Sequence, residues 1–349
     1  MHGVVFLGDR ELALQEFPDP TPGPGEVVVK IRASGMCGSD LHTYRAPRGG
    51  AAGGLGLGGD SSTVIAGHEP CGVVVARGNG VTDRQATIGQ RVMNFHYDGC
   101  GVCHHCRQGW TQMCVEGATV YGITGHGAHA PYMLMPAETL VPLPDELSFI
   151  EGAAVSCGAG TAYHALGRMG VRGGNTLAVF GQGPVGLAAT LFASAMGARV
   201  FAVDISAERL ALAHQLGAEQ TINSMTDDPI ANLKALTHGQ GADFSLDASG
   251  APEARVAAVR ACRAWGTVCF VGEGKTVTLN VSQDMLRKQL TIIGSWTFSI
   301  TGQADCAHFV ADNRIPLEQL FTHRFALDDA GQAYRLFDQQ TIGKGVFVF

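Results

Sequence analysis

The stretch from Leu177 to Asp204 constrains the fold of this chain more than any other part of the sequence. A short apolar run, Leu177 to Phe180, leads directly into the glycine pattern G-x-G-x-x-G at 181–186. A segment rich in Ala and Leu then runs to Met196, and a second apolar run ends in Asp204. A strand, a glycine turn, a helix and a second strand in this order form the unit that holds a dinucleotide. The sequence therefore predicts a doubly wound α/β domain with a parallel sheet.

Each residue of the glycine pattern has its own expected task in binding the cofactor. Gly181 permits the tight turn, Gly183 lets the backbone approach the pyrophosphate, and Gly186 lets the helix pack close to the strand. The helix begins at Pro184 and Val185, where free N–H groups and the positive end of the helix dipole face the phosphates. These residues are the predicted phosphate-binding residues.

Asp204 lies about where an acid meets the adenosine ribose hydroxyls, roughly 20 residues after the glycine pattern. A carboxylate at this place would repel a 2′-phosphate. We therefore predict NAD rather than NADP as the cofactor. Arg209, shortly after Asp204, is also predicted to contact the cofactor.

Composition limits the remaining possibilities. A chain of 349 residues with 46% hydrophobic residues can bury the cores of two domains. Its net charge of −7, without a basic block, argues against nucleic acid as a partner. No apolar run is long enough to span a membrane, and the first residues do not form a signal peptide. Ten cysteines, four of them tightly clustered, favour metal binding in a reducing cytoplasm over a disulfide scaffold.

The first part of the chain is predicted to be all-β and barrel-like. Short strand patterns at 25–33, 72–76 and 90–93 are separated by Gly- and Pro-rich turns. The glycine-rich run from Arg48 to Asp60 is expected to be a loop without chemistry. A last strand at 343–349 is expected to return to this domain. The prediction is therefore a dinucleotide domain, 155–295, inserted between 1–154 and 296–349.

Around the dinucleotide unit, helix and strand patterns alternate, as a doubly wound sheet requires. The expected helices are 151–165, 207–215, 229–237 and 252–263. The expected strands are 242–247, 266–271 and 289–294.

Four cysteines, Cys100, Cys103, Cys106 and Cys114, follow the spacing C-x2-C-x2-C-x7-C. Four thiolates at such short intervals can close around one tetrahedral Zn²⁺ and leave no open position, which makes the site structural. An iron–sulfur cluster is the alternative, but the long last gap and the absence of a following Cys-Pro weigh against it. With four thiols at hand, the neighbouring His104 and His105 are expected to be spacers.

A second metal site is suggested by Cys37, His68, Glu69 and Cys157. Each residue taken alone is equally well explained as a buried thiol or as a histidine with an ordinary partner. In combination with a nicotinamide site, these residues favour a metal site more strongly than they do singly. A hydride transfer from an alcohol needs an electrophile, and a catalytic zinc takes about three protein ligands and leaves one position open.

Taken together, these motifs resemble those of the zinc-dependent medium-chain dehydrogenases, a family that includes alcohol, sorbitol and threonine dehydrogenases. The resemblance rests on Cys37-x-Ser39-Asp40-x-His42, on Gly67-His68-Glu69, on the four-cysteine lobe and on the glycine pattern, and it covers nearly the whole chain. It implies a GroES-like β-barrel catalytic domain beside a Rossmann domain, in a homodimer or homotetramer.

The resemblance also implies roles for single residues. Cys37, His68 and Cys157 would bind catalytic zinc, and Glu69 would bind it directly in some states or members. Sorbitol and threonine dehydrogenases carry an acid near the position of Cys157, so this cysteine favours the alcohol dehydrogenases.

Three further positions match the family's proton transfer and ligand support. Asp40 would orient His68 from behind. Ser39 and His42 would form the proton relay. Lys344 is either a contact to cofactor phosphate or a solvated terminal lysine.

The resulting hypothesis is reversible oxidation of a secondary alcohol or polyol by NAD, with two Zn²⁺ per chain, one catalytic and one structural. Two alternatives remain open: a zinc-free quinone or enone reductase of the same superfamily, and a non-catalytic NAD-binding zinc protein. The sequence does not identify the small-molecule substrate. Tyr44, Met113, Tyr121 and Trp296 are candidate pocket walls that ordinary packing explains equally well.

Overall fold

The structure is a computed structural model that describes residues 1–48, 63–274, 276–339 and 343–349. The chain divides into two compact units. The first comprises Met1–Gly160, Phe298–Gln339 and Lys344–Phe349, and the second comprises Thr161–Thr297. The predicted domain limits, 1–154, 155–295 and 296–349, stay a prediction. The glycine-rich loop predicted at 48–60 lies, apart from Arg48, outside the described residues.

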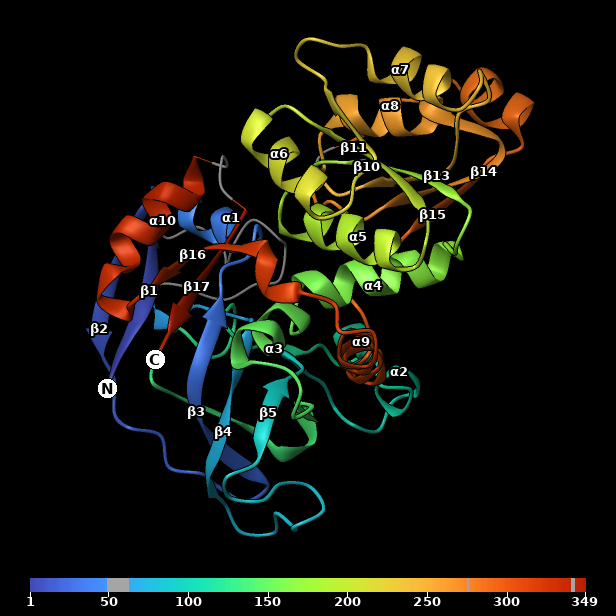
Figure 1. Ribbon diagram of the computed structural model, residues 1–349. Helices are drawn as coiled ribbons and strands as arrows, with labels where there is room; N and C mark the ends of the chain where they lie inside the picture. The colour runs from blue at the N-terminus through green and yellow to red at the C-terminus, as the bar shows by residue number, and fades with distance from the viewer. Residues whose placement is uncertain (49–62, 275, 340–342) are drawn as a thin grey trace. The chain divides into compact units, whose positions relative to one another are not determined.

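The second unit contains a six-stranded parallel sheet (Figure 1). In spatial order its strands are β12 (Gln220–Asn223), β11 (Arg199–Asp204), β10 (Thr176–Phe180), β13 (Ala242–Asp247), β14 (Cys262–Phe270) and β15 (Thr291–Gly294). The chain starts in the middle of the sheet, moves outward to β12 and then returns to continue on the other side of β10. This strand order is that of the doubly wound dinucleotide fold, and it confirms the predicted class.

Helices cover both faces of this sheet (Figure 1). On one face lie α5 (Pro184–Ala195) and α6 (Ala207–Gln215), and on the other lie α7 (Pro229–Leu236) and α8 (Pro252–Ala261). The strands are buried on both sides, which explains their continuous apolar runs. Phe180, Phe201 and Val268 lie in the core beneath α8.

Two strand limits in this unit differ from the prediction. The helix expected to reach Arg263 ends at Ala261, and β14 begins at Cys262 instead of Gly266. The register of β14 shifts against β13, and Trp265 takes φ +62°. A bulge therefore interrupts the strand before Gly266, where the sequence pattern predicted that the strand would begin. Gln289 also has a left-handed backbone, φ +52°, and β15 therefore starts only at Thr291.

The first unit is built on a seven-stranded sheet that is antiparallel except for one strand pair. The path runs β16 (Phe321–Phe325), β17 (Lys344–Val348), β3 (Glu26–Gly35), β4 (Pro70–Arg77), β5 (Arg91–Asn94) and β9 (Leu140–Pro142), and β8 (Tyr132–Pro136) also pairs with β3.

Strand β3 is the spine of this sheet. It pairs with β4 along one edge, while β8 takes the first half of the other edge and β17 takes the last residues, Ala33–Gly35. The last strand of the chain thus lies beside the end of β3 that leads to Cys37, as the predicted return to the first part of the chain requires.

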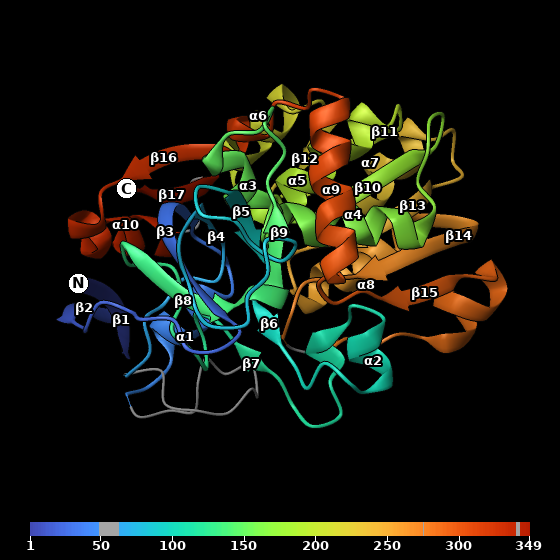
Figure 2. The same ribbon diagram turned by 90° about the horizontal axis from the view of Figure 1, so that it is seen from below.

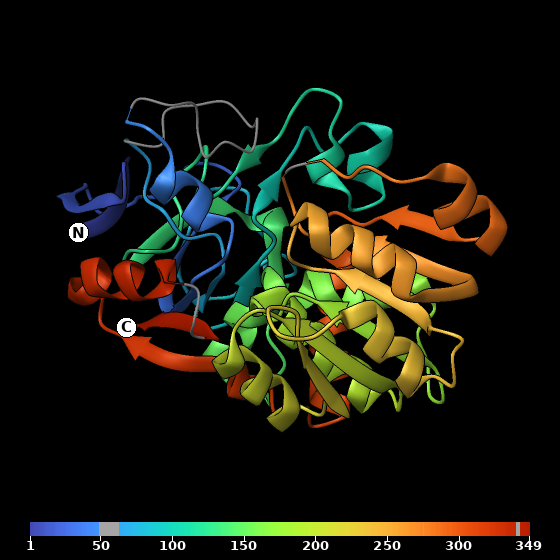
Figure 3. The same ribbon diagram turned by 90° about the horizontal axis from the view of Figure 1, so that it is seen from above.

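Several elements of the first unit were not predicted. The hairpin of β1 (His2–Gly8) and β2 (Glu11–Glu16) lies near α10 (Ala330–Asp338), as Figure 3 shows. Two more helices are α1 (Asp40–Arg45) and α9 (Ile300–Asp312). Buried residues recur at helical spacing along α10, from Ala330 through Tyr334 to Phe337, so this helix packs one apolar face onto the unit.

The helix expected at 151–165 is two helices, α3 (Phe149–Val155) and α4 (Gly158–Met169). The chain breaks at Ser156 and Cys157, where Ser156 Oγ donates to Gly152 O at 3.0 Å and to Pro70 O at 2.8 Å. A side chain that bonds to the backbone one turn earlier weakens a helix at that point. The interruption therefore places Cys157 in the turn between the two helices.

The four cysteines lie in a lobe of the first unit that contains β6 (Tyr97–Asp98), α2 (His104–Arg107) and β7 (Thr119–Val120), visible in Figure 2. In the part of the chain that the structure describes, no helix is both long and apolar enough to cross a bilayer.

Candidate active site

Four side chains from three remote points of the sequence meet in the first unit. The ligand atoms of Cys37, His68, Glu69 and Cys157 all lie within 4.8 Å of one another. All four residues are buried. Two thiols, an imidazole and a carboxylate form a donor set that suits Zn²⁺.

The fold explains why Cys37 points into this cluster. It follows β3 directly, and Met36 N donates to Gly345 O at 2.9 Å, which fixes the strand end against β17. Cys37 N then donates to Asp40 Oδ2 at 2.8 Å, which turns the chain into α1.

Glycines bring the other ligands close. Gly67 has φ +94°, a conformation that favours glycine, and it precedes His68 at the turn into β4. A Cβ at Gly35 would lie 1.9 Å from Glu69 Oε2, so only glycine allows this carboxylate to sit against β3. A Cβ at Gly152 would lie 2.4 Å from Cys71 Sγ, which shows how closely α3 packs beside β4 to place Cys157.

The two thiols of the cluster are in hydrogen-bond contact with each other. Cys37 Sγ and Cys157 Sγ lie 3.8 Å apart. The hydrogen bond from Cys157, helped by nearby His68, lowers the pKa of Cys37 well below its usual value. The same hydrogen bond, together with burial, raises the pKa of Cys157. The lowered pKa favours the thiolate form of Cys37, which is the form that binds a metal.

His68 is held from both sides. Its Nδ1 lies 3.0 Å from Asp40 Oδ1, and its Nε2 lies 3.1 Å from Ser39 Oγ. Burial disfavours the charged ring, but Asp40 and Cys37 outweigh it and raise the pKa of His68 well above its usual value. The Asp40 contact leaves Nε2 facing the cluster, as a metal ligand would need.

Glu69 is paired with Lys344, for which both expectations from the sequence are wrong. Lys344 is 1% exposed, and its Nζ contacts Glu69 Oε2 and donates to Met36 O at 3.0 Å. It is therefore neither a solvated terminal lysine nor available to a phosphate. Burial raises the pKa of Glu69 to about 7, although Lys344 opposes this.

The cluster fits a bound cation. Glu69 Oε1 is buried, and it has no hydrogen-bond partner among the residues that the structure describes. An unpaired buried carboxylate oxygen is costly, and a cation among the four ligand atoms would satisfy it. The residues present therefore fit the zinc ion that the sequence predicts.

The predicted relay residues lie at the start of α1. Ser39 is the residue before this helix, and its Oγ donates to Cys37 Sγ at 3.1 Å. His42 is exposed on the same helix, with its backbone N bonded to Ser39 O. The structure thus places Ser39 and Asp40 against the cluster and His42 at the surface.

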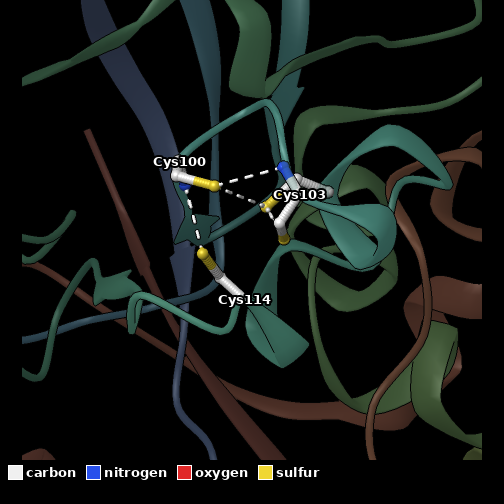
Figure 4. Close-up of side chains that lie close together, drawn as sticks. Cys100, Cys103 and Cys114 are labelled. Carbon is white, nitrogen blue, oxygen red and sulfur yellow. Dashed lines mark hydrogen bonds between the residues drawn. The ribbon is translucent and has the colours of Figure 1, made fainter.

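The lobe of four cysteines forms a second cluster, shown in part in Figure 4. Cys103 Sγ lies 3.4 Å from Cys106 Sγ, and the backbone N–H groups of Cys100 and Cys103 donate to Cys114 Sγ and Cys100 Sγ. His104 is exposed, in line with a spacer role.

Backbone N–H groups lower the pKa of two lobe thiols, whereas burial raises that of a third. N–H groups of Cys106 and Val115 lower the pKa of Cys103 to about 6. The N–H group of Cys100 lowers the pKa of Cys114. Burial and the hydrogen bond from Cys103 raise the pKa of Cys106 to about 12.

The lobe is attached to the start of α9. Ile300 N donates to Gly109 O at 2.9 Å, and Gln112 Nε2 donates to Phe298 O at 2.7 Å. A metal that folds this lobe would therefore also fix the chain where it enters α9.

In the second unit, the glycine turn has the geometry that a dinucleotide needs. Gly181 has φ +89°, and its Cβ would lie 2.8 Å from Ser249. A Cβ at Gly186 would lie 1.8 Å from Gly181 O, so the helix can approach only with glycine there. Open space surrounds the Cβ position of Gly183, the residue before α5, where a pyrophosphate could approach.

Asp204 ends β11 beside this turn. Its carboxylate accepts from the backbone N–H groups of Gln182 at 2.5 Å, Ile205 at 2.7 Å and Ser206 at 2.9 Å. A carboxylate has about four acceptor positions, so it can still accept from one ribose hydroxyl. Burial lowers the pKa of Arg209, and Asp204 opposes this effect, which places the guanidinium near Asp204.

Sequence reasoning missed several residues around the metal cluster. The ring of buried His96 lies 5.2 Å from the ring of His68, and burial lowers the pKa of His96 to about 3. Tyr334 donates to Asp40 Oδ2 from a distant helix, and His129 contacts the Tyr334 hydroxyl. No local motif marks these residues, because only the tertiary fold brings them together. Tyr44, a candidate pocket wall, packs against Phe6 and Tyr334 in the core.

Four further thiols have no place in either cluster. They are buried and belong to neither cluster: Cys71, Cys262, Cys269 and Cys306.

A dinucleotide fold joined to a thiol-rich metal cluster is the architecture of the zinc-type dehydrogenases. Residues 184–312 match the family described as zinc-binding dehydrogenase, and residues 23–145 match the alcohol dehydrogenase GroES-like domain. The chain belongs to the zinc-dependent medium-chain dehydrogenase family.

Individual relatives are similar to this chain along nearly their whole length. YphC of Escherichia coli (strain K12), an uncharacterized zinc-type alcohol dehydrogenase-like protein, is 41% identical over 100% of this chain and 99% of its own. Sorbitol dehydrogenase 1 of Saccharomyces cerevisiae is 33% identical over 95% of this chain and 92% of its own. An alcohol dehydrogenase of E. coli CFT073, solved with the cofactor NADH, is 26% identical with a TM-score of 0.86, covering 100% of this chain and 99% of its own.

Proposed function

We propose that this protein transfers a hydride reversibly between the hydroxyl-bearing carbon of a secondary alcohol or polyol and NAD. Zinc would be held by Cys37, His68 and Cys157, and Glu69 would bind it through its unpaired oxygen in some states, so that one position can open to the substrate. The observation that carries the proposal is the buried cluster itself: four ligand atoms from remote points of the sequence lie within 4.8 Å of one another.

Zinc bound there would act as a Lewis acid on the substrate hydroxyl and lower its pKa. Ser39 Oγ, next to both Cys37 Sγ and His68 Nε2, is placed to accept the proton that the hydroxyl releases. His42, exposed on the same helix, would deliver that proton to solvent. Asp40 would hold the His68 ring in place throughout.

The substrate class is inferred from two sources. The sorbitol dehydrogenase relative points to a polyol. Cys157, in contrast, matches the alcohol dehydrogenases, as the sequence resemblance implies. The proposal therefore covers secondary alcohols and polyols.

NAD is the proposed cofactor because of Asp204. Its buried carboxylate lies at the end of β11, where it would repel a 2′-phosphate and accept from a ribose hydroxyl. We expect kcat/KM with NAD⁺ to exceed that with NADP⁺ by about a hundredfold or more, from about 3 kcal/mol of charge repulsion in a partly buried site.

The structural zinc, the assembly and the location complete the proposal. Cys100, Cys103, Cys106 and Cys114 would hold the second zinc. A homodimer or homotetramer is inferred from the family, and sedimentation would determine which. Ten unpaired cysteines, six of them proposed as ligands, favour a reducing cytoplasm.

The decisive experiment combines metal analysis with a substrate panel. We expect two zinc ions per chain and NADH formation from at least one member of a panel of polyols and secondary alcohols. Removal of zinc with a chelator should abolish turnover, and returning zinc should restore it.

Two outcomes would contradict the proposal. Equal activity in metal-free protein would favour a zinc-free reductase. One tightly bound zinc in the lobe, with NADH binding but no turnover on any substrate, would favour a non-catalytic NAD-binding zinc protein.

A further inference from the structure

A chain of buried polar side chains runs from His68, in the cluster of candidate metal ligands, to Ser34 on β3. Ser34 Oγ lies 2.7 Å from His129 Nδ1, and His129 Nε2 lies 2.7 Å from the Tyr334 hydroxyl. Tyr334 donates to Asp40 Oδ2 at 3.1 Å, and Asp40 Oδ1 lies 3.0 Å from His68 Nδ1. All five residues are buried.

The donors and acceptors of this chain can be arranged in one direction only. The Asp40 carboxylate only accepts, so the Tyr334 hydroxyl must donate to it. The Tyr334 oxygen must then accept from an N–H on His129 Nε2. His129 Nδ1 is left as the acceptor for the Ser34 hydroxyl. Burial lowers the pKa of His129 to about 4, in agreement with a neutral ring that carries one proton.

Packing fixes the members of this chain in place. The Tyr334 ring stands edge-on to Phe6, with ring centres 4.8 Å apart. His129 lies directly over the turn before His68, since a Cβ at Gly67 would come within 2.4 Å of His129 Nδ1. The backbone on either side is also paired, with His129 N donating to Ala66 O at 2.8 Å.

Asp40 is the point where these contacts meet the metal cluster. Its Oδ2 accepts from Tyr334 and from Cys37 N, while its Oδ1 contacts His68. Tyr334 from α10, the backbone of Cys37 and the ring of His68 therefore meet at one carboxylate, and His129 reaches it only through Tyr334. A carboxylate held this firmly can orient a histidine ligand and set which of its nitrogens is free.

We propose that Tyr334 and His129 are positioning residues for the metal ligand His68. They fix the Asp40 carboxylate, and through it the orientation of the His68 ring with Nε2 toward the cluster. This inference rests on the proposed function, because it assigns a task within the proposed metal site. Neither residue touches substrate or metal.

The test is metal affinity measured with Co²⁺, which reports the site without catalysis. Tyr334→Phe removes only the hydroxyl. Outer contacts of metal ligands are typically worth 10- to 100-fold in affinity, so for this more remote contact we expect about a tenfold weaker Co²⁺ affinity at the Cys37 site. The visible spectrum of Co²⁺ at that site should also change.

The chain supplies two matched references. Tyr44 is buried, and its ring packs 5.5 Å from that of Tyr334, yet its hydroxyl is not part of the polar chain. Tyr44→Phe should change the affinity less than twofold. The four-cysteine lobe should bind Co²⁺ equally in both variants, as an internal reference.

A rescue experiment separates positioning from packing at His129. Gln at this position can place an amide N–H near the Nε2 site, whereas Leu cannot. We expect His129→Leu to weaken Co²⁺ binding as Tyr334→Phe does, and His129→Gln to recover most of the loss.

The outcomes are distinct. If the wild-type protein binds no Co²⁺ outside the lobe, the proposed function fails. If the Cys37 site binds Co²⁺ equally in wild type and Tyr334→Phe, with an unchanged spectrum, the proposed function stands and the positioning role is overturned. A loss of affinity in Tyr44→Phe as large as in Tyr334→Phe would also overturn it, because packing would then explain both.

Discussion

The two clusters of candidate metal ligands in this protein are built in opposite ways. The lobe gathers four thiols within residues 100–114, whereas the other cluster draws on Cys37, His68, Glu69 and Cys157. The lobe ligands are mostly half-buried and are supported by their own backbone N–H groups. The second cluster is buried and is supported by side chains from remote elements. A site made by a short loop serves folding, and a site made by the whole unit can serve chemistry.

The charges around the two clusters differ as well. The buried cluster has Lys344 beside Glu69 and Asp40 beside His68, so its ligands are already balanced by fixed charges. In the lobe the thiolates are stabilised by peptide dipoles. The buried cluster should therefore persist without metal, while the lobe should depend on it.

The largest expected effect comes from breaking the buried cluster. Cys37→Ala should lower kcat about a thousandfold or more, because the metal that is lost would lower the activation free energy by several kcal/mol. NADH binding should remain, and metal analysis should show one zinc, in the lobe. Cys306→Ala is the control, because Cys306 is buried on α9 and belongs to neither cluster. Retained turnover in Cys37→Ala would show that the buried cluster is not the catalytic metal site.

The next largest effect concerns the buried charge pair. Lys344→Met leaves the Glu69 carboxylate without its cation, and removal of one partner from a buried pair costs about 3 kcal/mol or more. Urea unfolding of metal-free protein should show this loss, and Glu69→Gln in the same chain should recover part of it. In zinc-loaded protein the loss should be smaller, since the ion then compensates Glu69. An equal loss with and without zinc would argue against Glu69 as a ligand.

The lobe should show the reverse behaviour. Cys106→Ser should remove the lobe zinc and unfold residues 98–116 locally, with a loss of about 2 kcal/mol from the hydrogen bonds to Phe298 and Ile300. Hydrogen exchange should become fast in the lobe and remain slow in β3 and β4. Zinc at the Cys37 cluster should be retained. Loss of both ions in Cys106→Ser would contradict the prediction, because it would mean that the lobe and the Cys37 cluster unfold together.

The same contrast explains what could be predicted from the sequence. The C-x2-C-x2-C-x7-C spacing and the glycine pattern are local, and the structure places their residues as local geometry requires. The grouping of Cys37, His68 and Cys157 was accessible only through a family resemblance, because it depends on how β3, β4 and α3 pack.

Residues that act through tertiary contacts left no signal. Tyr334 looks like one more apolar residue on the buried face of α10, and His129 lies in an irregular segment. Lys344 looked exposed because it is charged and near the chain end, yet its strand pairs in the centre of a sheet. The break at Ser156 was hidden because Ser and Cys occur in ordinary helices.

The smallest expected effect compares the reactivity of the thiols in metal-free protein. Iodoacetamide at pH 7 should modify Cys103 and Cys114 at least about tenfold faster than Cys157, because a thiolate is the nucleophile and the lobe thiols are more accessible. Backbone N–H groups lower the pKa of Cys103 to about 6, so its thiolate is already dominant at pH 7 and raising the pH should change its rate little. The raised pKa of Cys157 predicts a rate that is low at pH 7 and increases as the pH rises. Zinc should protect both sites, and mass spectrometry of peptides would measure each rate. Comparable rates for Cys103 and Cys157 would mean that the buried cluster opens without metal, so that the difference in support between the two clusters would not hold.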